Sequence, residues 1–207
     1  NLDEEADLLA PPTELELEDR WVLTKLQKVI EEATKNLERF EISVTSQKIY
    51  DFIWSVFCDW YIELCKSRFQ QGGETSINAQ RILVYVMTAS LKLLHPFMPF
   101  ITEEIFCTLH PEEETIMLSD WPVYKEEWNF KAEEEMLEHC KDLVKGIRNV
   151  RTEMDVPPSR KSKVFIVSDD AAIRETFIRN EESYRNLAFA SEVDVQADKA
   201  GIGEDAV

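Results

Sequence analysis

Apolar residues recur at every third or fourth position along the first half of the chain, a spacing that predicts amphipathic helices. The first predicted helix covers about 18–40, and the second covers about 45–69. The second is apolar around most of its circumference, which is typical of a helix inside a bundle. A polar, glycine-containing stretch at 70–74 predicts a loop before a third helix at about 76–94. These segments, joined by short breaks, predict an antiparallel helical bundle.

Two prolines shape the turn at 93–106, the proline corner, between the third predicted helix and a fourth at 99–109. Pro96 and Pro99 disfavour helical geometry in the residues before them, and Pro99 suits the first turn of a helix. We expect the proline corner to be a packing hub in which six large side chains are buried. They are Phe97, Met98, Phe100, Ile101, Ile105 and Phe106. Truncation of Phe100 should then destabilise the protein more than replacement of Pro96.

The second half of the chain changes in character after a non-periodic stretch at 110–122. A short extended segment is expected at Ile116–Leu118, and Asn129 is expected to cap a long helix that ends near Asp155. The apolar face predicted for the long helix consists of Met136, Cys140, Leu143, Ile147, Val150 and Met154. A strand at 163–167, a helix at 170–179 and a strand at 192–196 follow.

The pattern as a whole predicts a mainly α protein in four parts. A linker at 1–12 precedes the helical bundle at 13–125. The long helix and a small α/β unit then occupy 126–197, and a second linker covers 198–207.

The chain carries 41 Asp or Glu residues against 23 Lys or Arg residues, which gives a formal net charge of −18. Nucleic-acid binding normally requires a basic surface, so this net charge on its own disfavours it. The distribution is uneven, however, because residues 139–163 hold seven basic and three acidic side chains. This basic region is where a phosphate backbone would be tolerated.

Six cations in the basic region are candidate contacts for RNA phosphates. They are Lys141, Lys145, Arg148, Arg151, Arg160 and Lys161. The first three are spaced four and three residues apart, which places them on one face of a helix. We expect that face to be exposed, opposite the apolar face, and to contact phosphates without base specificity. The alternative is that these cations only neutralise the nearby Glu133–Glu135 and Glu138.

Few residues outside the basic region suggest catalysis, metal binding or base stacking. The sequence holds no glycine-rich phosphate loop, and its three histidines lie far apart. Its four cysteines form no CxxC pair, so we expect reduced core thiols and no metal site. Core positions are expected for Trp21, Trp54, Trp60 and Trp121. No apolar run reaches membrane-spanning length, and we expect a cytoplasmic protein without a membrane partner.

Four stretches occur in an order that resembles one enzyme family. They are YDFIWSVFCDWYIELCK at 50–66, LLHPFMPFITEEIF at 93–106, IMLSDWP at 116–122 and IRNVRTEMDVPPSRK at 147–161. Together they resemble the C-terminal part of valyl-tRNA synthetases, which are class I aminoacyl-tRNA synthetases, and the bacterial form in particular. The proline corner is shared in outline with the isoleucine and leucine enzymes, whereas the first and last stretches favour valine. The resemblance covers about 10–197, with Phe106 where the family usually has Trp.

The resemblance implies an anticodon-binding helical bundle with a small α/β appendix, within an enzyme that joins valine to tRNA using ATP and Mg. The HIGH and KMSKS signatures of the catalytic domain, and the editing domain, are absent from the sequence. The resemblance therefore implies a non-catalytic fragment with no cofactor of its own. In the family, a further bundle helix would precede Asn1 and a coiled-coil arm would follow Val207. The implied partners are a valine-accepting tRNA and the missing catalytic domain of the same chain, in an enzyme expected to be a monomer.

Two alternatives stay open at this point. The chain could be the same domain of an isoleucine or leucine synthetase, or a helical module that binds only protein. The net charge alone favours the protein-binding module. A basic, aromatic-lined groove in an otherwise acidic surface would favour tRNA binding instead.

Overall fold

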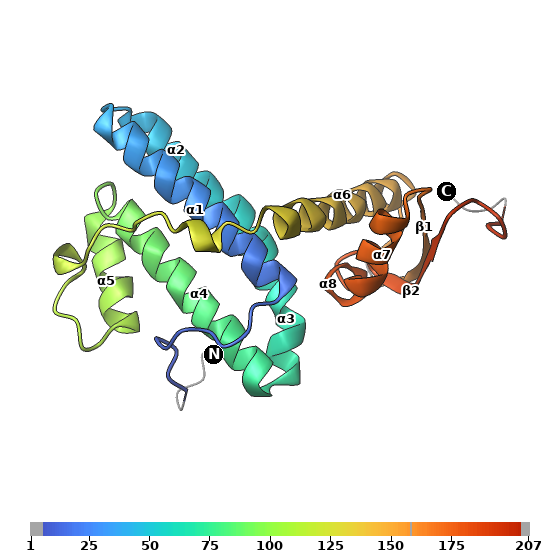
Figure 1. The fold of residues 1–207 in the computed structure, drawn as a ribbon, viewed down its shortest axis with the longest axis horizontal. Helices are drawn as coiled ribbons and strands as arrows, with labels where there is room; N and C mark the ends of the chain where they lie inside the picture. Colours follow the sequence, from blue (N-terminus) through green and yellow to red (C-terminus); the bar gives the residue numbers. More distant parts are fainter. Residues whose placement is uncertain (1–5, 158, 204–207) are drawn as a thin grey trace. The chain divides into compact units, whose positions relative to one another are not determined.

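A computed structural model describes residues 6–157 and 159–203, so the outer parts of both predicted linkers and Pro158 lie outside the described residues. The chain divides into two compact units between Glu134 and Glu135 (Figure 1). Each unit has its own secondary structure and is described by itself.

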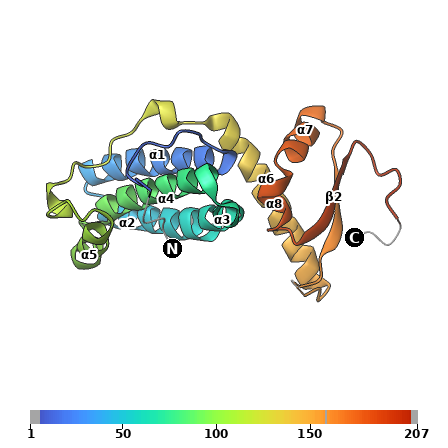
Figure 2. The same cartoon turned by 90° about the horizontal axis from the view of Figure 1, so that it is seen from below.

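The first unit is a helical bundle, which confirms the predicted mainly α fold class. Its helices are α1 (Leu17–Glu38), α2 (Ile42–Asp51), the π-helix η1 (Phe52–Tyr61), α3 (Ile62–Gln71), α4 (Gly73–Leu94) and α5 (Pro99–Leu109). Helix α1 packs against α2, η1 and α4, and α4 also packs against α3 and α5 (Figures 1 and 2). The loop predicted at 70–74 is only a tight turn, because Gly72 and Gly73 adopt φ angles of 71° and 67°.

The predicted second helix is one continuous helical stretch of α2, η1 and α3, with π geometry in its middle. A π-helix bonds each residue to the fifth one along, so side chains five apart come onto the same face. Phe52 and Phe57 are five apart and both are buried against the bundle. The π geometry thus keeps one buried face along a helix whose apolar spacing changes at this point.

The proline corner is only partly buried, and the expected packing hub is wrong. Phe106 is buried and packs with Leu91 and Ile116. In contrast, Phe100 is 91% exposed, and Met98 and Ile101 are about half exposed. Pro99 begins α5 as predicted. The prediction for Pro96 is wrong, because His95 before it keeps helical angles, with φ −53° and ψ −40°. One face of α5 packs on α4, and Phe100 lies on another face.

The segment after α5 returns along α1 as an extended chain (Figure 1). At one end of the segment, the Trp121 indole donates a hydrogen bond to Thr34 Oγ1 at 2.9 Å. At the other end, the Phe130 amide donates to Thr24 Oγ1 at 2.8 Å. Polar side chains of α1 therefore accept hydrogen bonds from both ends of the return segment and fix its position along α1.

Two predictions for the return segment and its approach are wrong in detail. Ile116–Leu118 is a 3₁₀-helix, η2, rather than an extended segment, because Thr115 Oγ1 accepts from the Met117 amide at 3.2 Å. Asn129 ends a second 3₁₀-helix, η3 (Glu126–Trp128), and the long helix α6 begins two residues later.

The second unit contains most of α6 and a small α/β element. Its elements are α6 (Lys131–Glu153), β1 (Ser162–Val167), α7 (Ala171–Arg179), α8 (Glu181–Arg185) and β2 (Ala190–Gln196). The two strands pair in parallel, with Val164 opposite Val193, and the predicted order of strand, helix and strand is confirmed. The helix α8 was not expected, because five residues are too few to show a helical period.

Candidate nucleic-acid interface

The six candidate cations do not form the exposed stripe expected for α6. Lys141 and Arg151 are buried, while Lys145 and Arg148 are exposed. The most buried apolar residues of α6 are Leu137, Cys140 and Val144, which lie on the same side of the helix as Lys141. The expected separation of an apolar inner face from a cationic outer face is therefore wrong. Long cationic side chains can run their aliphatic stems along apolar surface, which a simple polar-or-apolar pattern misses.

Arg151 holds the chain between α6 and β1. Its guanidinium donates to Ser162 Oγ at 2.6 Å and to the carbonyl of Pro157 at 2.9 Å, and also to the carbonyl of Arg160. It also lies 5.5 Å from the centre of the Phe189 ring. These contacts make Arg151 a positioning residue for the following turn.

Arg148 ties α6 to the approach to β2. Its Nε donates to the carbonyl of Leu187 at 3.0 Å, and its guanidinium lies 5.7 Å from the Phe189 ring centre. Phe189 has a φ angle of 54°, a left-handed backbone conformation that is uncommon for a phenylalanine. The stacked arginines hold this ring and its strained backbone in place.

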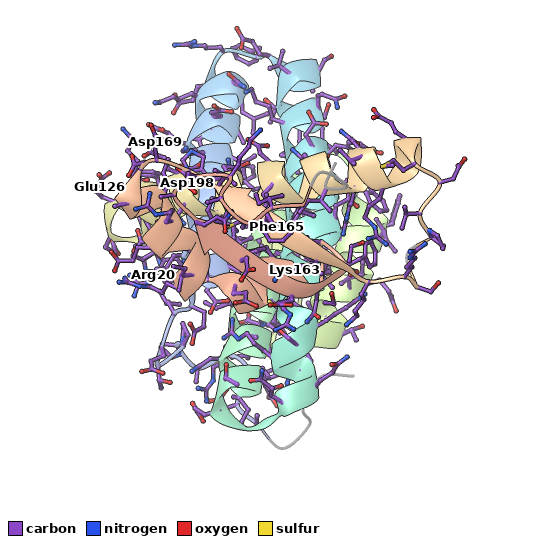
Figure 3. The ribbon with its side chains drawn as sticks, turned by 90° about the vertical axis from the view of Figure 1, so that its right-hand side faces the viewer. Arg20, Glu126, Lys163, Phe165, Asp169 and Asp198 are labelled. Carbon is purple, nitrogen blue, oxygen red and sulfur yellow. The ribbon has the colours of Figure 1, made fainter. Side chains whose placement is uncertain are left out.

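Acidic neighbours neutralise part of the basic region. Lys141 pairs with Glu138 at 3.1 Å, and Lys145 lies 3.7 Å from Asp142. Lys163 on β1, labelled in Figure 3, pairs with Glu192 and Asp194 of β2 at 3.1 and 2.6 Å. These pairings limit the positive charge that α6 and β1 present.

Arg160 and Lys161 differ from the other four cations. Both are exposed, and neither forms an ion pair with any residue that the structure describes. Arg160 lies in the turn whose carbonyls at Pro157 and Arg160 are held by Arg151, and Lys161 follows it. Two unneutralised cations thus project from a braced turn.

Two of the acids expected to pair with α6 cations, Glu133 and Glu134, are instead neutralised by α1. Arg20 pairs with Glu133 at 3.1 Å, and Lys25 and Lys28 pair with Glu134 at 2.9 and 2.5 Å. Within the first unit, these pairs attach the start of α6 to α1. The alternative, in which the basic region only neutralises nearby acids, therefore holds for Lys141 and Glu138. It does not hold for Glu133 or Glu134, which pair with α1.

Two aromatic sites in the first unit were not expected from the sequence. Lys125 Nζ lies 4.6 Å from the Trp128 ring centre, and Trp128 meets Tyr85 edge-on at 4.6 Å. On α2 and η1, Tyr50 and Trp54 are both more than half exposed, with ring centres 6.1 Å apart. The core position expected for Trp54 is therefore wrong. Its spacing of four from Tyr50 placed the two rings on one helix face but did not show that this face is exposed.

Comparison with known proteins identifies the family of this chain. Residues 19–166 match the family described as the anticodon-binding domain of tRNA ligase. The chain belongs to that family. The anticodon-binding domain implied by the four sequence stretches is thereby confirmed.

Relatives of the anticodon-binding domain include valine–tRNA ligases from several bacteria. That of Clostridium tetani is 46% identical over 190 residues, which cover 91% of this chain and 21% of the relative. That of Clostridium acetobutylicum is 42% identical over 209 residues, covering 100% of this chain and 24% of the relative. For Staphylococcus saprophyticus the identity is 35% over 185 residues, 88% of this chain and 21% of the relative. The chain spans about a fifth to a quarter of these relatives.

In the described part of the anticodon-binding domain, few side chains suggest a catalytic or metal-binding site. His95 and His110 hydrogen-bond to the hydroxyls of Thr102 and Thr88, each at 2.7 Å, and burial lowers the pKa of His110. Among the described residues, no three His, Cys, Asp or Glu side chains gather in a way that could hold a metal ion. No helix there has both the length and the apolar character to cross a membrane.

Proposed function

We propose that this chain is the tRNA-binding region of a valine–tRNA ligase and that it holds the anticodon end of a valine-accepting tRNA. Membership of the anticodon-binding family carries the proposal, and the identity to valine–tRNA ligases over 91% of the chain supports valine as the amino acid. The region acts by binding and has no ligase chemistry of its own.

In this proposal, the joining of valine to tRNA takes place outside the matched fifth of the relatives' length. ATP and Mg would be bound there, by the catalytic part of the same polypeptide. That catalytic part is the protein partner of this region. The complete enzyme would act as a monomer in the cytoplasm.

The basic region supplies the phosphate contacts in this proposal. Arg160, Lys161 and Lys145 are exposed and would meet the RNA backbone directly. Lys141, Arg148 and Arg151 would act mainly by holding the second unit in shape, which follows from the burial of Lys141 and Arg151 and from the hydrogen bonds of Arg148 and Arg151. Phosphate contacts fix position and register, and base identity is read elsewhere.

The test is tRNA binding by the full-length ligase and by this chain over a salt series. The full-length protein should bind valine-accepting tRNA and charge it with valine, and should not charge the isoleucine or leucine tRNAs. Affinity should fall with salt, because each phosphate contact releases bound counterions. Valine tRNA with a replaced anticodon is the matched control and should bind more weakly. Equal affinity for the two tRNAs would disprove the proposed contact with the anticodon.

A further inference from the structure

Five large apolar side chains of the first unit face solvent at the start of α5 and in η2. The exposed fractions are 50% for Met98, 91% for Phe100, 48% for Ile101, 76% for Met117 and 75% for Leu118. The first three belong to the start of α5 and the last two to η2. Clusters of exposed apolar side chains on this scale mark interaction sites. We call these five residues the α5 apolar surface.

The two parts of the α5 apolar surface are held next to each other. Ile116 is buried with Phe106 of α5, and the Ile116 amide donates to Glu103 Oε2 at 3.1 Å. Phe100 precedes Glu103 by three residues, so the two are neighbours on the helix surface. Met117 and Leu118 directly follow Ile116, which places them beside this edge of α5.

Exposed carboxylates flank the α5 apolar surface along the chain. Exposed acids lie on α5, on the segment before η2 and on the segment after it. They are Glu104, Glu112, Glu113, Glu114 and Asp120. Among the described residues, no ion pair includes any of these five. Lys92 is turned towards the core, with its Nζ 6.0 Å from the Phe106 ring centre.

We infer that the α5 apolar surface docks a basic, apolar-centred surface of the catalytic part of the full-length ligase. Apolar residues at the centre of a protein interface exclude water, and charged residues at its rim select a partner of opposite sign. An RNA backbone is excluded by the acidic rim. A second copy of this chain would bring two like-charged rims together, so it is a poor occupant. The inference rests on the proposed function, since it requires a longer polypeptide.

The test is oxidation of methionines by hydrogen peroxide, measured by mass spectrometry of the full-length ligase and of this chain. Met98 and Met117 lie on the surface, and Met154 is 53% exposed at the end of α6. In this chain, all three should oxidise at similar rates. In the full-length ligase without tRNA, Met98 and Met117 should oxidise at least about fivefold more slowly than Met154, because a docked partner excludes solvent.

Three other outcomes would overturn the inference. Equal oxidation rates for all three methionines in the full-length ligase would mean that the surface is uncovered. Protection that appears only when tRNA is added would assign the surface to RNA. Protection in this chain that grows with its concentration would assign it to a second copy.

Substitutions test the apolar centre and the acidic rim separately. In the full-length ligase, Phe100→Ser should restore oxidation of Met98 and Met117, whereas Phe40→Ser should not. Phe40 is the matched control, because it is 86% exposed in the same unit but lies in the turn between α1 and α2. Replacement of Glu112, Glu113 and Glu114 by Lys should also restore oxidation. If it does not, the partner is not basic.

Valine charging by the same preparations separates the two proposals. A ligase that charges tRNA with valine but oxidises Met98 and Met117 as fast as Met154 disproves only the docking surface. A full-length protein that charges no valine tRNA disproves the proposed function, whatever its methionines do.

Discussion

At the scale of single residues, the first unit is organised around one buried ionic network. Arg68 Nη1 contacts the two Asp19 carboxylate oxygens at 2.9 and 2.8 Å and Glu18 Oε1 at 3.2 Å. The Tyr61 hydroxyl donates to Asp19 Oδ1 at 2.7 Å. All four side chains are buried. This network was not predictable from the sequence, because Arg68 lies 49 residues from Asp19 and a helical period does not pair distant charges.

Arg68→Ala should lower the free energy of unfolding of the first unit by about 3–5 kcal/mol, since it leaves buried carboxylates without a partner. Lys35→Ala is the matched control, because Lys35 forms an exposed pair with Glu31 on α1 and should cost only about 0.5 kcal/mol. Urea unfolding followed by tryptophan fluorescence reports this unit alone, since all five tryptophans lie between 21 and 128. Equal unfolding midpoints for the two variants would contradict a central role for the network.

Glu18 should make the stability of the first unit depend on pH. Burial, and then the charge of Asp19, raise the pKa of Glu18 from 4.5 to about 7, although Arg68 opposes this. A raised pKa in the folded state means that the stabilisation is complete below about 4.5 and is lost as pH rises through about 7.

The comparison variant for this pH dependence is Glu18→Gln, which cannot ionise. Between pH 4.5 and 7.5, wild type should lose stability relative to Glu18→Gln by on the order of 3 kcal/mol. Urea unfolding at the two pH values measures the difference. If the gap between the two proteins stays constant with pH, Glu18 does not ionise in this range.

At the scale of elements, the two ends of α5 contribute differently to the stability of the bundle. Phe106→Ala should destabilise the first unit by about 3–5 kcal/mol, because Phe106 is buried with Leu91 and Ile116. Phe100→Ala, six residues earlier, should cost less than about 0.5 kcal/mol because that ring is exposed. Thermal unfolding of this chain measures both, and a large loss of stability with Phe100→Ala would show that its ring is covered.

The long helices were predictable because an apolar face repeats over many turns, as it does from Val22 to Ala33 in α1. The face that α6 buries was not, because Lys141 and Arg151 are charged in the sequence but buried in the fold. The exposure of Phe100 was equally hidden, since periodicity finds apolar residues and does not show which of them have a partner. The basic region was predictable as a candidate site. The different roles of Arg151, which holds the turn, and of the exposed Arg160 and Lys161 became visible only from the hydrogen bonds of Arg151.

At the scale of the whole molecule, the proposed function requires a chain with a net charge of −18 to concentrate its RNA contacts in a few places. Arg160→Glu with Lys161→Glu should weaken tRNA binding by the full-length ligase and reduce its salt slope by about two, one for each cation that no longer meets a phosphate. Unfolding should stay unchanged, because both side chains are exposed. Fluorescence titration with labelled tRNA at several salt concentrations measures the slope.

The matched control for the two cations is Arg179→Glu, which changes an exposed arginine of α7 paired with Glu175. Its salt slope should equal that of wild type. A wild-type slope for the Arg160 and Lys161 double variant would leave the basic region without a role in RNA binding. Arg151 is unsuitable for this test, because its replacement should release the braced turn as well as remove its charge.

The π-helix η1 gives the central helix of the bundle a tolerance to changes in length. A π segment accommodates an extra residue within a helix that is otherwise α. Removal of one exposed residue between Phe52 and Phe57, such as Ser55, would reduce their spacing from five to four. An ordinary α-helix places residues four apart on one face, so the buried faces on both sides of the deletion would stay aligned. The same deletion inside α1 or α4 would rotate everything after it by about 100° and turn much of the buried face away from the core. Length variation among related chains should therefore collect in η1.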